Sequence, residues 1–207
     1  LEKMCGILHA VKNQEPKLYE HLKNVMSEQG KVWGKRELLT DIGGRANKAM
    51  FIDRGHILAS VYDRRGDKQV IFKYDPNDII AGPEFLRNSI ASLKLEALPG
   101  THYVFITYDQ MQEVFRKFPA TQELATMITA EYRFREMQHL IGLHKKGIER
   151  VADFYDTNPH LLPAGEIMTD IEVATFLLLS EGALRDLRAK LIDQGRLKNT
   201  RRGMFGK

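Results

Sequence analysis

The spacing of apolar residues changes near the middle of the 207-residue chain. Over residues 32–106 they form short runs between turn residues, as in Met50-Phe51-Ile52 before Asp53-Arg54-Gly55. Similar runs occupy residues 57–62, 70–72, 93–98 and 103–106. Short strands at intervals of about 8–12 residues predict a small antiparallel sandwich or roll. Before this stretch, helical spacing over residues 18–29 predicts a helix that ends at Gly30.

After Tyr108 the spacing becomes helical, and Phe118-Pro119 separates a short helix from a long one over residues 120–143. One stripe of the long helix carries Leu124, Met127, Ile128, Phe134, Met137, Leu140 and Ile141. Its roughly 24 residues would span about 36 Å, more than a small domain needs for its own core. Such a helix commonly pairs with a copy of itself. The alternative is a helix packed only on its own domain.

Three shorter helices are predicted near residues 147–155, 170–178 and 180–194. Thr169 or Asp170 suits the N-cap of the second helix, and Ser180 suits that of the third. Ala174 is small enough to let the last two helices cross closely. Residues 194–200 then predict a turn and a strand. The pattern indicates a helix-turn-helix followed by a wing.

The net charge of +4 is unevenly distributed along the chain. From Arg185 onward the charge is +6, because only Asp186 and Asp193 oppose the basic side chains. These basic residues are Arg185, Arg188, Lys190, Arg196, Lys198, Arg201, Arg202 and Lys207. A basic cluster on a short helical motif is typical of proteins that bind nucleic acid.

Several classes of protein are disfavoured by the sequence. Cys5 is the single cysteine, which excludes an intramolecular disulfide and a cysteine-ligated iron–sulfur cluster. No histidine pair has metal-binding spacing, and no nucleophile elbow, phosphate loop or dinucleotide fingerprint occurs. We therefore expect no enzyme activity, metal or cofactor. No apolar run is long enough for a membrane span, and a cytoplasmic location is expected.

The order of short motifs resembles the cyclic-AMP receptor (Crp/Fnr) family of transcription regulators, in a divergent branch. The motifs are Phe51-Ile52-Asp53-Arg54-Gly55-His56-Ile57, Arg65-Gly66-Asp67-Lys68, Tyr74-Asp75-Pro76-Asn77-Asp78-Ile79-Ile80, Glu149-Arg150-Val151 with Phe154, and Asn158-Pro159-His160-Leu161. The resemblance implies an α+β protein with an antiparallel β-roll of the cyclic-nucleotide-binding type, a double-stranded β-helix. It also implies a sensor domain over residues 1–119, a dimerisation helix over 120–145 and a winged helix-turn-helix over 146–207.

As partners, the resemblance implies double-stranded DNA, a second copy of the chain and a small-molecule effector. DNA contacts are expected from Ser180, Glu181, Arg185, Arg188, Lys190, Arg201 and Arg202. Most of the basic side chains would hold phosphates, which gives affinity without sequence specificity. The family's base-contacting Arg-Glu and Arg positions carry Glu181-Gly182 and Asp186 here, so the DNA site of better-known members does not transfer.

The ligand segment departs from cyclic-nucleotide binders. They use Gly-Glu-Leu for the ribose, but Pro83 separates Gly82 from Glu84 here, and Ala91-Ser92 replaces their Arg-Ser phosphate pair. Candidate ligand-binding residues are Gly82, Glu84, Arg87, Ser92 and Lys94. Cyclic AMP is not the expected effector, because a charge-assisted phosphate contact is lost. Two alternatives stay open: a true cyclic-nucleotide regulator, and a β-roll protein whose C-terminal module contacts proteins.

Overall fold

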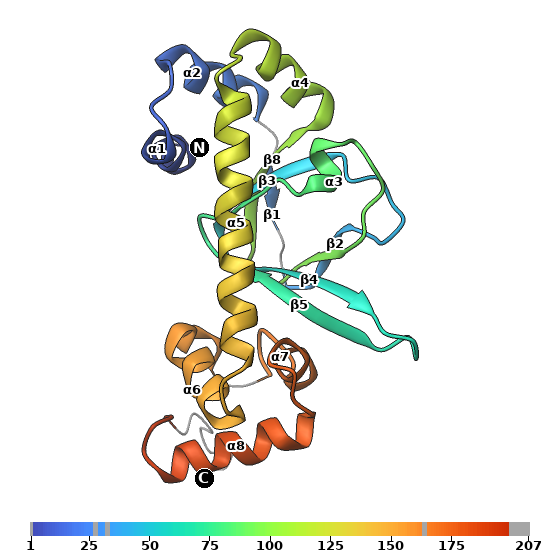
Figure 1. Cartoon of the computed structure of the whole chain (residues 1–207), viewed down its shortest axis with the longest axis vertical. Coiled ribbons are helices and arrows are strands. Elements are labelled where there is room, and N and C mark those ends of the chain that lie inside the picture. The colour runs from blue at the N-terminus through green and yellow to red at the C-terminus, as the bar shows by residue number, and fades with distance from the viewer. Residues whose placement is uncertain (1, 27–28, 32–33, 163–164, 199–207) are drawn as a thin grey trace. The chain divides into compact units, whose positions relative to one another are not determined.

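A computed structural model of the chain describes residues 2–26, 29–31, 34–162 and 165–198. The chain divides into two compact units (Figure 1). The sheet unit consists of Leu1–Val61 and Phe72–Glu136, and the helical unit consists of Tyr62–Ile71 and Met137–Lys207. Among the described residues, no helix combines the length and apolarity that a membrane span requires.

Within the described residues, the strands form two four-stranded sheets, and the observed strand pairs are antiparallel. The first sheet has the order β1 (Gln29–Lys31), β8 (His102–Thr107), β3 (Lys48–Arg54) and β6 (Ile79–Ile80). The second has the order β2 (Glu37–Thr40), β7 (Lys94–Ala97), β4 (Ile57–Tyr62) and β5 (Lys68–Tyr74). The prediction of antiparallel sheets from short apolar runs is confirmed. The prediction of a helix as far as Gly30 is wrong, because Gly30 pairs with Tyr103 in the first sheet.

Strand β3 explains how a continuous apolar run fits this arrangement. Alternate side chains of a strand point to opposite faces of its sheet. Ala49 and Phe51 therefore enter one hydrophobic cluster, whereas Met50 and Ile52 enter another. Because both faces of β3 are covered, all four side chains are buried.

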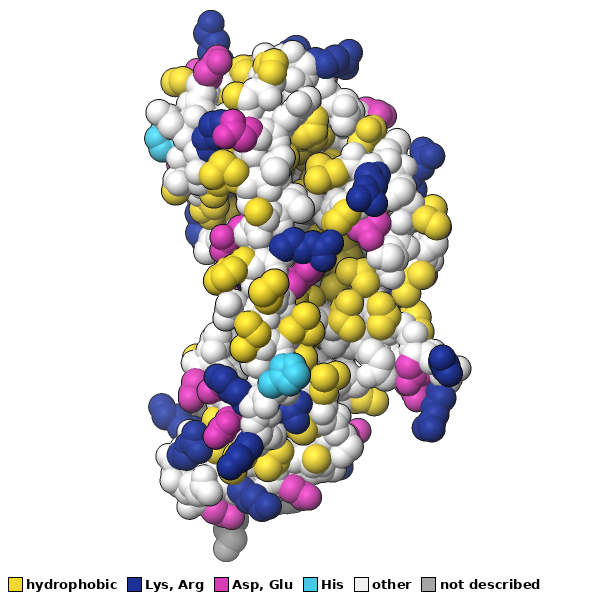
Figure 2. Space-filling view, viewed as in Figure 1, with side chains coloured by type: hydrophobic (Ala, Val, Ile, Leu, Met, Phe, Trp, Pro, Cys, Tyr) yellow, Lys and Arg dark blue, Asp and Glu magenta, His cyan; other side chains and the backbone are white. Residues whose placement is uncertain are grey.

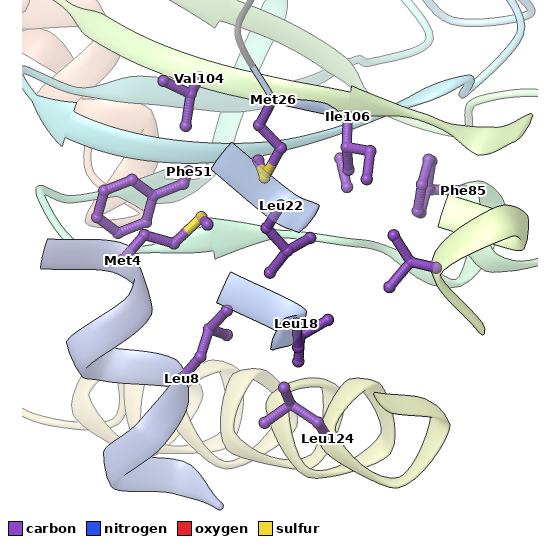
Figure 3. Packing of buried hydrophobic residues seen from close by; sticks show 12 residues of the cluster. Met4, Leu8, Leu18, Leu22, Met26, Phe51, Phe85, Val104, Ile106 and Leu124 are labelled. Carbon is purple, nitrogen blue, oxygen red and sulfur yellow. The ribbon is translucent and has the colours of Figure 1, made fainter. Parts of the chain in front are cut away.

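Helices cover one face of the first sheet. These are α1 (Glu2–Val11), α2 (Pro16–Val25), α4 (Tyr108–Lys117) and the start of α5 (Thr121–Leu143), while α3 (Pro83–Leu86) lies at the margin. Figure 3 shows Met4, Leu8 and Leu18 from the first two helices packed near Leu124 of α5 and Phe51 of β3. The sequence prediction had missed α1 and α3, but the predicted long helix agrees with α5 within one residue of its start.

The helical unit contains α6 (Gly147–Thr157), a short 3-10 helix (Pro159–Leu161), α7 (Asp170–Phe176) and α8 (Glu181–Asp193). The three predicted C-terminal helices are thus confirmed. In the predicted wing, residues 194–198 form turns and bends rather than a strand. The rest of the wing, including Arg201 and Arg202, lies outside the described residues.

Candidate functional site

The pair of helices α7 and α8 is fixed by hydrogen bonds that the local sequence supplies. Thr169 caps α7 by accepting from the backbone N–H of Glu172, and the Glu172 carboxylate accepts from the backbone N–H of Thr169 at 3.0 Å. This reciprocal capping box satisfies two otherwise unpaired donors. Ser180 caps α8 by accepting from the N–H of Ala183 at 3.2 Å. Both N-caps agree with the sequence prediction.

The turn between the two helices is short and contains one unusual backbone conformation. Leu178 has a φ of +51°, a region that side chains other than glycine rarely adopt, and it is exposed. The N–H of Leu179 donates to the Ala174 carbonyl at 2.8 Å, which closes the turn. Ala174 is buried, and so are Leu177 and Leu184 beside it. The helices therefore cross over a small apolar core, as predicted from Ala174.

Arg188 lies inside this helix pair. Its side chain is only 11% exposed, and it donates to the Tyr155 hydroxyl at 3.1 Å and to Asp170 Oδ2 at 2.6 Å. Chiefly through the hydrogen bond from Arg188, the pKa of Asp170 is held below its usual value. Arg188 thus connects α8 to α6 and to the first turn of α7 through one guanidinium group.

The other predicted DNA contacts divide between an exposed surface and residues that lie outside the described part of the chain. Ser180, Arg185 and Lys190 are exposed, and Glu181 is half-buried. Arg185 forms an ion pair with Glu181 one turn away, and its Nε lies 3.4 Å from Asp170 Oδ2. The structure therefore brings Ser180, Glu181 and Arg185 together at the start of α8. Arg201 and Arg202 belong to the undescribed residues.

The exposed side of α8 also carries residues without positive charge. Gly182 and Asp186 are exposed near its start, and Ala189 and Asp193 are exposed farther along. Together with Glu181, the two aspartates carry three negative charges, which exceed the two positive charges of Arg185 and Lys190. The positive charge predicted for the C-terminal segment is therefore not concentrated on the described face of α8.

The sheet unit contains a cavity of about 200 Å³ that two of the five predicted ligand residues border. Gly82 and Glu84 line this main cavity, and both also line a smaller adjoining cavity of about 60 Å³ that Ser92 borders. Pro83 occupies the first turn of α3, and Gly82 is the N-cap residue of that helix. This geometry places Glu84 beside Gly82 despite the inserted proline.

The two predicted basic ligand residues lie elsewhere. Neither Arg87 nor Lys94 lines the two cavities. Arg87 is exposed at the end of α3, and Lys94 forms an ion pair with Glu96 at 3.1 Å. The structure thus brings Gly82, Glu84 and Ser92 together and leaves the basic pair apart from them.

One side of α5 remains uncovered in the single chain. Met127, Phe134, Met137, Leu140 and Ile141 have exposed fractions between 39% and 60%. Figure 2 shows hydrophobic side chains gathered over the exposed part of this helix. Met127, Phe134 and Ile141 follow one another at intervals of seven residues, the period of a coiled-coil seam.

Comparisons with known proteins identify the fold. No model of a known protein family matches the chain, and no curated protein matches it in sequence. The chain is similar to the solved structure of a Crp/Fnr-family transcriptional regulator from Eubacterium rectale, with a TM-score of 0.70, 15% identity and 92% of each chain covered. It has the Crp/Fnr fold.

Two further structures agree with this assignment. FixK2 from Bradyrhizobium japonicum matches with a TM-score of 0.68 and 18% identity, over 81% of this chain and 85% of FixK2. A CRP-family regulator from Thermus thermophilus matches with a TM-score of 0.66 and 14% identity, over 81% of this chain and 85% of that one. The family resemblance of the sequence is thus confirmed at the level of the fold.

One feature of this Crp/Fnr-fold chain had no signal in the sequence. The turn between β4 and β5 belongs to the helical unit, where Lys68 lies 2.9 Å from the buried carboxylate of Glu172. The backbone N–H of Val70 also donates to Thr175 Oγ1 at 3.2 Å. These partners are more than 100 residues apart in the chain. Local patterns cannot reveal such contacts, although the turn itself was predicted from Arg65-Gly66-Asp67-Lys68.

Proposed function

We propose that the protein is a DNA-binding transcription regulator that acts as a homodimer and responds to an effector held in its sheet unit. The observation that carries this proposal is the capped helix pair α7–α8, in which α8 presents a face free of large apolar groups. In helix-turn-helix proteins the second helix enters the major groove with its N-terminal residues at the base edges. In this protein those residues are Ser180, Glu181 and Arg185.

The ion pairs of Arg185 determine how this side chain would bind DNA. Its guanidinium is exposed but shared between Glu181 and Asp170, so DNA binding exchanges these partners for a phosphate or a guanine edge. Lys190 stands exposed farther along α8 and suits a phosphate contact. Arg188 supports the interface indirectly, because its hydrogen bonds hold α8 against α6 and α7. Arg201 and Arg202 remain proposed phosphate contacts.

The exposed stripe of α5 supports the proposed dimer. Pairing two copies of this helix would cover Phe134, Met137 and Ile141, which a monomer leaves in water. A two-fold symmetric dimer presents two copies of α8 to DNA. Its binding site is then an inverted repeat with half-sites about 34 Å apart, or a multiple of that distance.

The domain organisation proposed from the sequence is compatible with this function. A β-roll sensor over residues 1–119 would carry one side of the effector cavity, and the dimerisation helix over residues 120–145 would complete its wall with Tyr132. A winged helix-turn-helix would occupy residues 146–207. The absence of an arginine beside Ser92 argues against cyclic AMP as the effector.

Selection of genomic fragments by the purified protein, at two salt concentrations, tests the proposal. We expect enrichment of an inverted repeat and a log–log salt slope of about −0.9 per neutralised phosphate. The double variant Arg185→Ala/Lys190→Ala should lose affinity and salt dependence. Arg116→Ala/Lys117→Ala removes the same charge from the exposed end of α4 and serves as the control. Equal losses in both variants would point to nonspecific electrostatic attraction.

A second candidate function is favoured by Asp186 and Asp193 on the exposed side of α8. With Glu181 they could repel phosphates and instead contact basic groups of a protein. In that case the selected fragments would show no common motif, and affinity for any DNA would stay low even at low salt. Asp186→Ala would then leave DNA retention unchanged or raise it without creating a sequence preference.

A further inference from the structure

The 200 Å³ cavity of the sheet unit has a carboxylate in its wall. Glu84 Oε1 accepts a hydrogen bond from Ser92 Oγ at 2.5 Å. Its Oε2 lies 3.2 Å from the position that a Cβ on Gly82 would take, so the carboxylate folds over this glycine. In the described part of the chain, no hydrogen bond to Oε2 is formed. One oxygen of Glu84 is thus available to a ligand.

The basic side chains that line the two cavities, Arg133 and Lys48, contact groups other than this carboxylate. Arg133, on the α5 side of the cavity, forms an ion pair with Glu136 at 3.3 Å, and its side chain is 70% exposed. Lys48 borders the smaller cavity, where its Nζ lies 4.2 Å from the centre of the Phe105 ring. Because Arg133 and Glu136 cancel, Glu84 determines the sign of the charge in the main cavity.

Two tyrosines complete the wall. The rings of Tyr74 and Tyr132 meet edge to face, with centroids 5.9 Å apart. Burial raises the pKa of Tyr74, and the carboxylates of Glu136, Asp78 and Glu84 raise it further. The charge of Arg135, which forms an ion pair with Asp78, partly opposes this effect of the carboxylates. Aromatic rings beside a carboxylate are a favourable environment for a cation and an unfavourable one for a phosphate.

We propose that this cavity binds a small organic cation, an amine with an apolar body, through Glu84 and the rings of Tyr74 and Tyr132. A protonated amine would donate to Glu84 Oε2, while its apolar part would lie against the two rings. The volume of the cavity equals the volume that about seven water molecules occupy in liquid water. A ligand of about eight heavy atoms suits this volume. The proposal rests on the proposed role of this cavity as the effector site.

Three probes of similar shape and different charge test the proposal: benzylammonium, benzyl alcohol and benzoate. Binding to the full chain is measured by ligand-observed NMR titration, with cyclic AMP as a fourth probe. We expect benzylammonium to bind about tenfold more tightly than benzyl alcohol, and benzoate and cyclic AMP to bind more weakly than either. Equal or tighter binding of benzoate would overturn the proposal, as would the absence of benzylammonium binding at millimolar concentrations.

The variant Glu84→Gln removes the charge but keeps an oxygen that can accept from Ser92. It should weaken benzylammonium about tenfold and leave benzyl alcohol within about twofold. Glu113→Gln, at an ion pair with Lys117 on α4, makes the same change away from the cavity and should have no effect. Tyr132→Phe keeps the ring and should retain the preference for the cation. If Glu84→Gln leaves this preference intact, the assignment of Glu84 is wrong.

Binding of DNA is measured separately on the same preparations. If the wild type binds an inverted repeat but shows no preference for benzylammonium, the ligand proposal fails and the regulator proposal stands. If benzylammonium binds in a Glu84-dependent manner while no DNA is retained, the cavity assignment stands and the DNA-binding function fails.

Discussion

Replacing Arg188 by methionine should destabilise the helical unit without removing an exposed DNA contact. Methionine keeps an apolar stem of similar length but loses the hydrogen bonds to Tyr155 and Asp170. A hydrogen bond to a charged group contributes about 1.5–3 kcal/mol. Asp170 keeps Arg185 as a partner, and its side chain is 23% exposed, so water offsets part of the loss. We therefore expect a cost of about 2 kcal/mol.

Amide hydrogen exchange, followed by mass spectrometry on peptides of α8, reports this change locally. A loss of about 2 kcal/mol corresponds to exchange that is about thirtyfold faster. The control is Arg185→Met on the same helix, where the side chain is 60% exposed and the ion pairs contribute little. Its exchange should change by about twofold or less. If the two variants behave alike, the structural role assigned to Arg188 is refuted.

Three further predictions concern the dimer, the backbone and the acid limit of stability. Phe134→Glu on the exposed stripe of α5 should shift sedimentation from dimer to monomer, whereas Gln122→Glu, exposed nearer the start of this helix, should not. Gly55→Ala should cost at least about 3 kcal/mol in urea unfolding, because φ is +79° and the new Cβ would lie 2.5 Å from Thr101 Cα. Gly66→Ala has a similar φ and open space, so a cost above about 2 kcal/mol there would contradict this reasoning. Burial alone would raise the pKa of Asp75, but the hydrogen bond from His56 and the charge of Lys73 hold it at about 2. Because this pKa is depressed in the folded state, its stabilisation is complete above about pH 4 and is lost as the pH falls toward 2. Asp75→Asn should flatten the decline of thermal stability over that range, and an unchanged decline would assign the acid sensitivity to other carboxyl groups.

The helix pair could be predicted from the sequence because its signals are local. Thr169 and Ser180 stand directly before their helices, and the apolar spacing that follows each cap requires no distant partner. Ala174 identified the crossing point for the same reason. Local spacing predicts the wrong secondary structure where pairing with a distant strand determines the backbone conformation. Gly30 looked like a helix end, yet its backbone pairs with Tyr103 from a strand more than 70 residues away.

The candidate sites were predicted less completely than the fold. Gly82, Glu84 and Ser92 were found because they occupy the family's ligand segment, and the structure brings them together. Arg188 was expected on the DNA-facing surface because basic residues on a second helix usually suggest DNA contact. Its partner Tyr155 lies 33 residues earlier and gives no local signal. The charge of a residue is visible in the sequence, but its burial depends on tertiary packing.

The turn between β4 and β5 limits how the helical unit can be transplanted. A fragment that begins at Met137 would contain α6, α7 and α8 but would lack Lys68, the ion-pair partner of the buried Glu172. It would also lose the backbone donor of Val70 that satisfies Thr175. A chimera that joins residues 137–207 to a foreign sensor would leave a buried charge without this partner. A helical unit that is exchanged between proteins should therefore include both of its chain segments, the β4–β5 turn and the C-terminal helices.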